Sequence, residues 1–312
     1  MILITGGLGF IGSHVARALL DLGETCVVTR RRTARLPEFL ADEAGGRLLV
    51  EPVDVTDQDA LLALGKRHTV SGIVHLAGAG IGAGGTLDAL TQNTRGLLSV
   101  LRAAEVWEVP RVGIASTIGV YGGVPGDRLR EDAPLPTASP HMIPAAKKAM
   151  EILALRAAAD AGFAVVNFRI AAIWGPLGRA ASPFFATPRL VHAAVNGEDP
   201  GTLHAEDGID MCYVKDCGRA IALLQTAGAL RHDTYNIGNG YATTNAEVAA
   251  AIRAVVPEAR VDLSTGHDPA GPGATVCLDT ERIREDTGYR PRYDVERAVA
   301  DYVAWLRAGN ER

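Results

Sequence analysis

The feature that most constrains this chain is a glycine-rich turn close to its first residue. Residues 5–12 read TGGLGFIG, directly after the apolar run Met1–Thr5 and before the helical pattern Ile11–Leu22. In a strand–turn–helix unit, such glycines permit the tight turn, the approach of a pyrophosphate and close packing of helix on strand. The helix N-terminus offers free N–H groups to phosphate oxygens. The pattern predicts a dinucleotide site at Gly6, Gly9, Phe10, Ile11 and Gly12.

Strand and helix patterns alternate through the first half of the chain. Apolar strand-like segments recur at 25–29, 47–52, 72–76, 112–116 and 164–170, and helical patterns lie at 87–107 and 145–161. This alternation predicts an α/β fold with a Rossmann-type doubly wound parallel sheet. After Trp174, Gly-Pro turns and loops predict a smaller C-terminal α+β subdomain for substrate.

We expect residues 1–172 to form the dinucleotide-binding Rossmann domain and residues 173–312 to belong mostly to the substrate subdomain. The segment at about 205–240 is expected to return to the Rossmann core.

Three arginines follow the second strand pattern, at Arg30, Arg31 and Arg32. A chain selective for NAD usually carries an acidic residue there, which binds the ribose 2′-OH. Guanidinium groups instead suit a 2′-phosphate, through charge-assisted bidentate hydrogen bonds. The N-terminal domain is therefore predicted to bind NADPH or NADP, with Arg30 and Arg31 better placed than Arg32. A solvated basic loop is the alternative interpretation.

Charge and cysteine usage exclude several classes of function. The chain has 31 Lys and Arg against 36 Asp and Glu, so its net charge of −5 gives no general attraction to nucleic acid or anionic membrane. The four cysteines show no metal or redox spacing, and no metal site is predicted. We find neither a signal-peptide pattern nor an apolar run of about 18 residues. A cytoplasmic protein is expected.

Several further segments occur in a fixed order. They are VDVTD at 53–57, HLAG at 75–78, NTRG at 93–96, STIGVYG at 116–122, IWGP at 173–176, YVKD at 213–216 and YNIGNG at 235–240. Together with the glycine turn, they resemble the extended short-chain dehydrogenases/reductases of the NAD-dependent epimerase/dehydratase type over nearly the whole chain. The resemblance implies further cofactor contacts at Asp54, Val55, Leu76, Ala77, Gly78, Asn93 and Lys147. For Asn93, a structural hydrogen bond is an equal alternative.

Members of this family use a Ser or Thr, a Tyr and a Lys for proton transfer, with Tyr and Lys one helical turn apart. The resemblance implies that Thr117, with Ser116 beside it, supplies the catalytic hydroxyl group and that Lys147 is the family's lysine. Ile143 stands in the tyrosine position, so the usual proton donor is missing. His141, Thr117, water or the substrate itself remain as replacements.

Two other positions depart from the family pattern. Ile118 and Gly119 stand where dehydratases carry an acidic pair, so dehydration is disfavoured. Ile209 stands where nucleotide-sugar enzymes usually carry an arginine for the diphosphate. The substrate pocket is therefore expected to be more apolar than in those enzymes.

These features together predict an NADPH-dependent ketoreductase for a hydrophobic ketone of the aromatic polyketide type, active in antibiotic tailoring. The pattern is similar to that of the tyrosine-less ketoreductases of angucyclinone tailoring, as in simocyclinone biosynthesis. A nucleotide-sugar epimerase or reductase with a relocated catalytic acid is the first alternative, and a non-enzymatic NADP(H)-binding sensor is the second. The family resemblance also implies a homodimer through the helices near 89–106 and 145–161.

Overall fold

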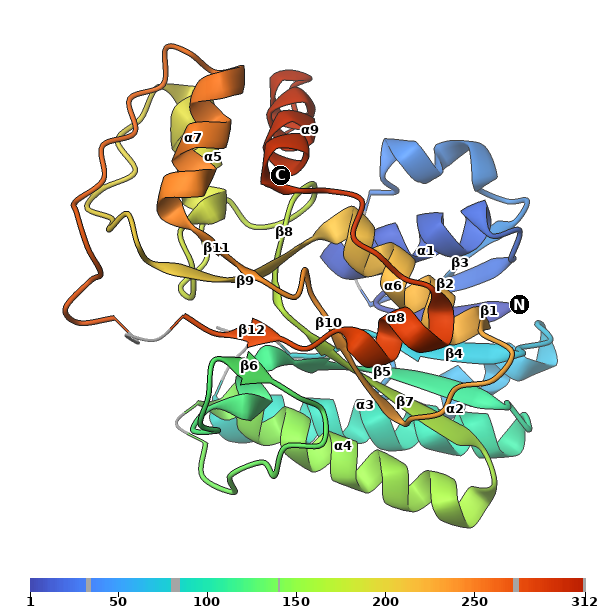
Figure 1. Ribbon diagram of the computed structural model, residues 1–312. Coiled ribbons are helices and arrows are strands. Elements are labelled where there is room, and N and C mark those ends of the chain that lie inside the picture. Colours follow the sequence, from blue (N-terminus) through green and yellow to red (C-terminus); the bar gives the residue numbers. More distant parts are fainter. Residues whose placement is uncertain (32–34, 80–84, 140, 272–274, 311–312) are drawn as a thin grey trace.

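The computed structural model describes residues 1–31, 35–79, 85–139, 141–271 and 275–310. Its centre is a seven-stranded, all-parallel sheet with the order β10-β7-β5-β4-β1-β2-β3 (Figure 1). The strands are β1 (Ile2–Thr5), β2 (Cys26–Arg30), β3 (Leu48–Pro52), β4 (Gly72–His75), β5 (Arg111–Thr117), β7 (Ala164–Ile170) and β10 (Thr234–Ile237). The predicted Rossmann-type sheet is confirmed.

Helices cover both faces of this sheet because its strands are apolar on both sides. Ile2 and Ile4 of β1 face the core shared with α1 (Phe10–Asp21) and α6 (Val214–Thr226), whereas Leu3 faces the opposite core. The opposite face is covered by α2 (Gln58–Leu62), α3 (Thr86–Val106) and α4 (Met142–Ala161) (Figure 1). No helix of the described residues is long and apolar enough to cross a membrane.

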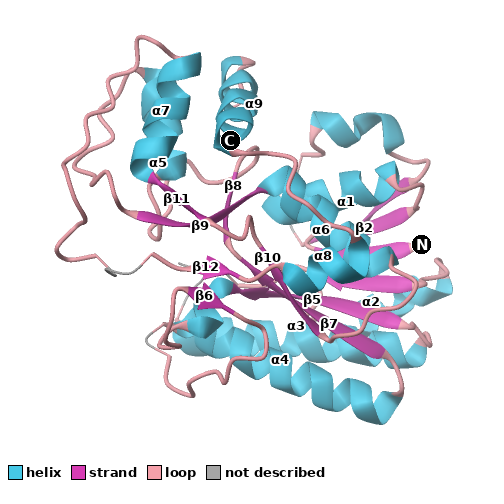
Figure 2. Cartoon of the chain, in the orientation of Figure 1, coloured by secondary structure: helices cyan, strands magenta, loops and turns pink. Residues whose placement is uncertain are grey.

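A second, smaller unit is built around a three-stranded sheet with the order β11-β9-β8. Its strands are β8 (Ala172–Trp174), β9 (Gly208–Tyr213) and β11 (Ala242–Thr244), and its helices are α5 (Thr187–Asn196), α7 (Asn245–Val255) and α9 (Val295–Arg307) (Figure 2). Trp174, Tyr213 and Tyr302 pack edge to face in its core. From this unit the chain returns to the main sheet, where α6 packs on α1 and β10 pairs with β7.

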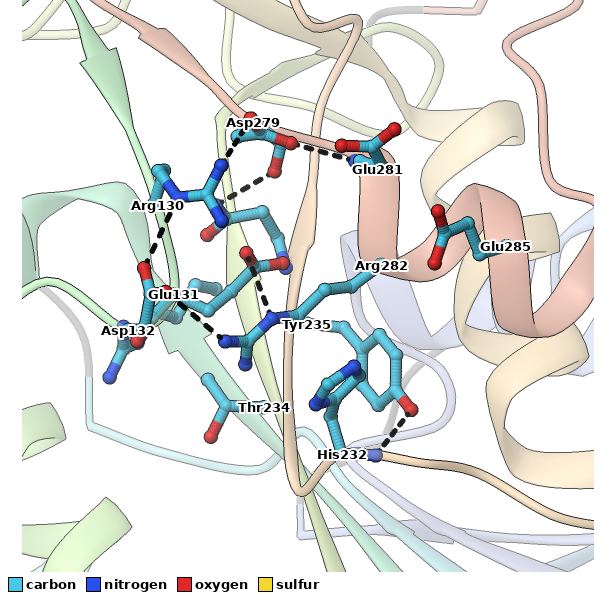
Figure 3. Close-up of polar contacts among 12 residues, drawn as sticks. Arg130, Glu131, Asp132, His232, Thr234, Tyr235, Asp279, Glu281, Arg282 and Glu285 are labelled. Atoms are coloured by element: carbon cyan, nitrogen blue, oxygen red, sulfur yellow. Dashed lines mark hydrogen bonds and ion pairs between the residues drawn. The ribbon is translucent and has the colours of Figure 1, made fainter.

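The C-terminal part of the chain also contacts the first half directly. The strand β12 (Cys277–Leu278) pairs in parallel with β6 (Arg128–Leu129), and α8 (Glu281–Thr287) follows it. Figure 3 shows the ion pairs around this junction, in which Arg130 lies 3.7 Å from Asp279 and Arg282 lies 3.6 Å from Glu131. Burial raises the pKa of Glu131, whose carboxylate also accepts a hydrogen bond from the backbone of Asn236.

A buried polar network joins α4, β7 and β10. Arg169 on β7 forms an ion pair with Glu151 on α4 at 2.8 Å, and the two side chains are only 7% and 6% exposed. Arg169 also donates to the Tyr121 hydroxyl at 3.0 Å, and this hydroxyl donates to Asn236 on β10 at 2.7 Å. Each of these four side chains forms a hydrogen bond or ion pair with another one of them, as is usual for buried polar groups.

Large apolar side chains remain exposed on the helices that cover one face of the sheet. They include Leu98 of α3 and Ile152 and Leu153 of α4. These are the helices through which a homodimer is expected, and the dimer stays a prediction.

Replacing Glu151 by glutamine should destabilise the fold by about 3–5 kcal/mol, because it leaves the Arg169 guanidinium buried without its counter-charge. The free energy of unfolding measured in urea checks this. The matched control is Asp160→Asn, which breaks the exposed pair with Arg156 and should cost less than about 1 kcal/mol. Equal effects of the two substitutions would contradict the role of the buried pair.

Candidate functional site

The glycine turn after β1 has the geometry that its sequence predicts. Gly6 has φ +67°, and a Cβ there would lie 3.0 Å from the backbone nitrogen of Ala77. The amide of Gly9 donates to the carbonyl of Gly6 at 2.9 Å, and α1 begins at the next residue, Phe10. A Cβ on Gly12 would lie 2.3 Å from the Gly6 carbonyl oxygen, so only glycine lets α1 approach the turn this closely.

A fourth glycine of the turn is also sterically required. A Cβ on Gly7 would lie 2.5 Å from side-chain carbons of Val28 on β2. Sequence reasoning did not assign a role to Gly7, since the requirement arises from a strand that is distant in the sequence. The sequence signal for this requirement was the pair of adjacent glycines, Gly6 and Gly7.

A cavity of about 330 Å³ opens at the carboxyl ends of the strands, beside this turn. In doubly wound sheets, ligands bind at this edge. It is lined by Gly6, Leu8, Gly9, Thr29, Arg30, Arg31, Val53, Asp54, Val55, Thr56, Ala77, Gly78, Ala79 and Gln92. The structure therefore brings most of the predicted cofactor residues together. The predicted residues Phe10, Ile11, Gly12, Leu76, Asn93 and Lys147 are not part of this lining.

The two arginines at the end of β2 differ in their contacts. The Nε of Arg30 is buried and has no hydrogen-bond partner in the described part of the chain. Arg31 donates to the side chain of Gln92 at 3.1 Å and lies 4.0 Å from the carboxylate of Asp54. Gln92 was not foreseen, since it comes from α3. Arg32 lies outside the described residues.

Asn93 holds the loop after β4 next to this cavity. Its side-chain oxygen accepts from the amide of Ala79 at 2.8 Å, and its amide donates to the Ala79 carbonyl at 3.4 Å. A Cβ on Gly78 would lie 3.0 Å from the same Asn93 oxygen. Of the two interpretations of Asn93, the structure shows a structural bond, made to the loop that lines the cavity.

The two candidate hydroxyl groups on β5 lie in different surroundings. The Thr117 oxygen accepts from the amide of Gly119 at 3.2 Å, and its own proton has no acceptor among the described residues. Ser116 is buried, and its hydroxyl donates to Glu151 within the buried network. The catalytic role predicted for Ser116 therefore loses its geometric basis, because its proton is already held by a carboxylate.

Lys147 lies on α4, one turn before Glu151. Its amine makes no hydrogen bond or ion pair in the described part of the chain, and burial lowers its pKa to about 8 despite the opposing charge of Glu151. The pKa of the buried His75 falls to about 3, through burial first and then through the charge of Lys147. The charge of Lys147 therefore acts on His75, the last residue of β4.

The start of α4 explains the positions of the remaining candidates. His141 is its exposed N-cap residue, and its side chain makes no capping bond. Ile143 is half-buried in the first turn. The next residue, Pro144, would lie 3.0 Å from a Cβ on Gly119, so this turn packs beside Thr117. No titratable side chain occupies position 143 to replace a tyrosine.

The C-terminal unit holds a separate cavity of about 400 Å³. Ile209 and Met211 of β9 line it together with Phe184, Phe185 and Arg189. Arg189 comes from α5 and provides a cation that sequence reasoning did not foresee, although position 209 itself is apolar as predicted. Beside the cavity, the side chains of His204, Asp207 and Asp268 have potential ligand atoms within 4.8 Å of one another, a cluster that the sequence did not predict.

Comparisons with known proteins agree with this geometry. The model of the NAD dependent epimerase/dehydratase family matches residues 2–238. A dTDP-glucose 4,6-dehydratase of Actinoplanes sp. is 30% identical over 98% of both chains. A UDP-glucose 4-epimerase of Azospirillum brasilense is 29% identical over 98% of this chain and 92% of its own.

Solved structures show the same fold. UDP-glucose 4-epimerase of Thermotoga maritima, crystallised with UDP-glucose, superimposes with a TM-score of 0.84 at 23% identity over 99% of both chains. The Stenotrophomonas maltophila UDP-glucose 4-epimerase with bound NAD reaches a TM-score of 0.85 at 20% identity, over 99% of this chain and 98% of its own. The chain belongs to the NAD-dependent epimerase/dehydratase family of extended short-chain dehydrogenases/reductases.

Proposed function

We propose that this protein is a nicotinamide-dependent oxidoreductase that acts on the sugar of a nucleotide sugar, as an epimerase or a reductase. One observation carries the proposal: the likeness to a dTDP-glucose 4,6-dehydratase spans 98% of both chains and so includes the C-terminal unit with its own cavity. The nucleotide-sugar alternative is thereby better supported than the polyketide ketoreductase.

The residues present fit a dinucleotide cofactor. Side chains at Gly6 or Gly12 would fill the turn that would approach the pyrophosphate, and Arg30, whose buried Nε has no hydrogen-bond partner among the described residues, lines the same cavity. We infer NADP(H) from the two arginines at the end of β2. When bound, the nicotinamide supplies the acceptor or donor of hydride.

Two side chains of this protein would bind the reacting oxygen and transfer the proton. Thr117 has a free hydroxyl proton at the end of β5 and can hydrogen-bond the reacting oxygen of the substrate. Lys147 has a lowered pKa of about 8, close to the working pH that general acid–base catalysis needs. We therefore assign to Lys147 the proton transfer that a tyrosine performs elsewhere in the family. Ile118 and Gly119 leave no acid beside Thr117 for dehydration.

A second candidate function rests on a specific observation. Ile143 lies in the turn that packs beside Thr117, and Ile209 lines the C-terminal cavity; both are apolar where the family resemblance implies a polar side chain. This favours reduction of a hydrophobic aromatic ketone with NADPH, the function that the sequence predicts first.

A substrate panel distinguishes these functions. Incubation with UDP- and dTDP-hexoses and NADP⁺ should give epimerised or oxidised sugars, detected by chromatography and mass spectrometry. Arg189→Ala should raise KM for the nucleotide sugar at least tenfold, because Arg189 is the basic side chain that lines the C-terminal cavity. Turnover of aryl ketones but not of nucleotide sugars would favour the ketoreductase, the second candidate. Cofactor binding without turnover of any substrate would favour a non-enzymatic NADP(H)-binding sensor.

The pH dependence tests the role of Lys147. In the direction of carbonyl reduction the protonated amine is the donor, so the rate should be constant below about pH 8 and fall above it. Lys147→Arg keeps the positive charge but does not titrate in this range, so it should lower kcat at least 100-fold while cofactor affinity changes little. An unchanged inflection near pH 8 in this variant would assign the proton to another group.

Cofactor choice is tested at the end of β2. The double substitution Arg30→Ala and Arg31→Ala should weaken NADPH binding at least 100-fold, since two charge-assisted contacts to the 2′-phosphate are lost, and change NADH binding less than threefold. Fluorescence titration of both cofactors measures this. Arg95→Ala removes an exposed arginine outside the cavity lining and is the control. Equal losses for both cofactors would refute a 2′-phosphate site.

A further inference from the structure

A third cavity, of about 560 Å³, lies beside α1. Its walls come from α1, the start of α6 and the start and end of α9, which lie near one another in Figure 1. It shares no lining residue with the cavity beside the glycine turn, so a ligand here would not occupy the cofactor position. The volume falls in the range of about 300–1,000 Å³ that is usual for small-molecule sites.

The lining of this cavity is rich in positive charge. Its five cationic side chains are Arg17, Lys215, Arg219, Arg292 and Arg297. The lining also holds two carboxylates, so the cations exceed them by three (five less two). Asp21 is exposed and paired with Arg17, whereas Asp216 is buried, lies 3.8 Å from Arg219 and accepts the backbone amides of residues 292 and 293, both at 2.8 Å. An excess of positive charge along a concave wall concentrates anions.

Not all of these cations are engaged by carboxylates. Arg17 binds Glu43 at 3.2 Å, and Lys215 binds Asp301 at 2.7 Å. Arg219 lies 3.8 Å from Asp216 and also donates to the carbonyl of Arg290. In contrast, the side chains of Arg292 and Arg297 form no ion pair with a carboxylate within the described ranges, and Arg297 donates only to the carbonyl of Arg292, at 2.9 Å. Guanidinium groups with unused N–H donors are the usual partners of phosphate oxygens.

Aromatic rings form the opposite part of the wall. Phe39 stacks on His14 with ring centroids 5.0 Å apart, and Trp305 meets Phe39 edge to face at 6.2 Å. Burial lowers the pKa of His14 to about 4, so this ring is neutral at physiological pH and offers a flat surface without charge. Tyr293 lies under the guanidinium of Arg297 at 4.6 Å. A planar ligand ring can stack against such a surface.

We propose that this cavity binds a mononucleotide: Arg292 and Arg297 would hold the phosphate, and the base would pack against Phe39 and Trp305. Phosphate oxygens and an aromatic ring on one small molecule match the two kinds of wall. The site goes beyond the proposed function, because it needs neither the nicotinamide cofactor nor the sugar substrate.

Isothermal titration of the full chain with UMP tests the site. With saturating UDP-glucose present to occupy the proposed nucleotide-sugar site, binding of one equivalent of UMP is expected, and Arg292→Glu should weaken it at least tenfold because the phosphate then meets a carboxylate. Lys66→Glu is the control: it makes the same charge change at an exposed residue outside the cavity and should leave UMP affinity unchanged. Circular dichroism of both variants checks that they fold.

Fluorescence and competition complete the test. UMP should change the tryptophan emission of the wild type, and Trp305→Phe should remove most of this change although Trp107 and Trp174 remain. Inorganic phosphate should bind at least tenfold more weakly than UMP, because it lacks the base. The proposal is overturned if UMP does not bind, if Arg292→Glu binds it like the wild type, or if phosphate alone binds equally well. None of these outcomes depends on turnover of a nucleotide sugar.

Discussion

The ion pair between Glu151 and Arg169 fixes the geometry on which the candidate site depends. Glu151 lies one helical turn after Lys147, and its carboxylate also accepts the hydroxyl of Ser116 from β5. A single buried carboxylate thus joins α4 to β5 and β7. The position of Lys147 relative to Thr117 follows from this junction, because the two residues lie on the elements that Glu151 connects. The negative charge of Glu151 is tolerated in the core because both of its carboxylate oxygens accept hydrogen bonds from Arg169, and one of them also accepts from Ser116.

The parts of the site that depend on neighbouring residues could be predicted from the sequence. The glycines at 6, 9 and 12 identify a turn because their spacing is local, and the end of β2 identifies Arg30 and Arg31 for the same reason. The parts that depend on distant contacts could not be predicted. A side chain at Gly7 would clash with Val28 of β2, and Gln92 reaches Arg31 from α3. The hydroxyl of Ser116 donates to the buried carboxylate of Glu151. The sheet was predicted from apolar runs, but the polar strand TYNI at 234–237 carries no such run.

Family membership and individual residues constrain the function at different levels. Full-length likeness to epimerases and dehydratases shows the family to which the chain belongs, whereas the reaction proposed for it also depends on individual residues. If Ile143 stands in the tyrosine position, as the family resemblance implies, the proposed reaction needs another route for the proton. The Lys147 amine, whose pKa is lowered to about 8, is chemically able to exchange a proton near neutrality, whereas the exposed His141 makes no side-chain capping bond. In this proposal, the acid–base part of the site differs from that of relatives with a tyrosine and the cofactor part is kept.

The strand β10 is synthesised later than the other strands of the main sheet, and this affects how the chain folds during translation. Translation produces Tyr121 and Arg169 long before Asn236, and β7 remains the edge of the sheet until residues 234–237 have been made. An open parallel edge attracts other strands. A nascent chain that ends between residues 172 and 234 thus exposes β7 and an incomplete polar network, and we expect it to be prone to aggregation. Recombination between family members meets the same constraint: a single crossover in this interval joins a sheet from one parent to an edge strand from the other.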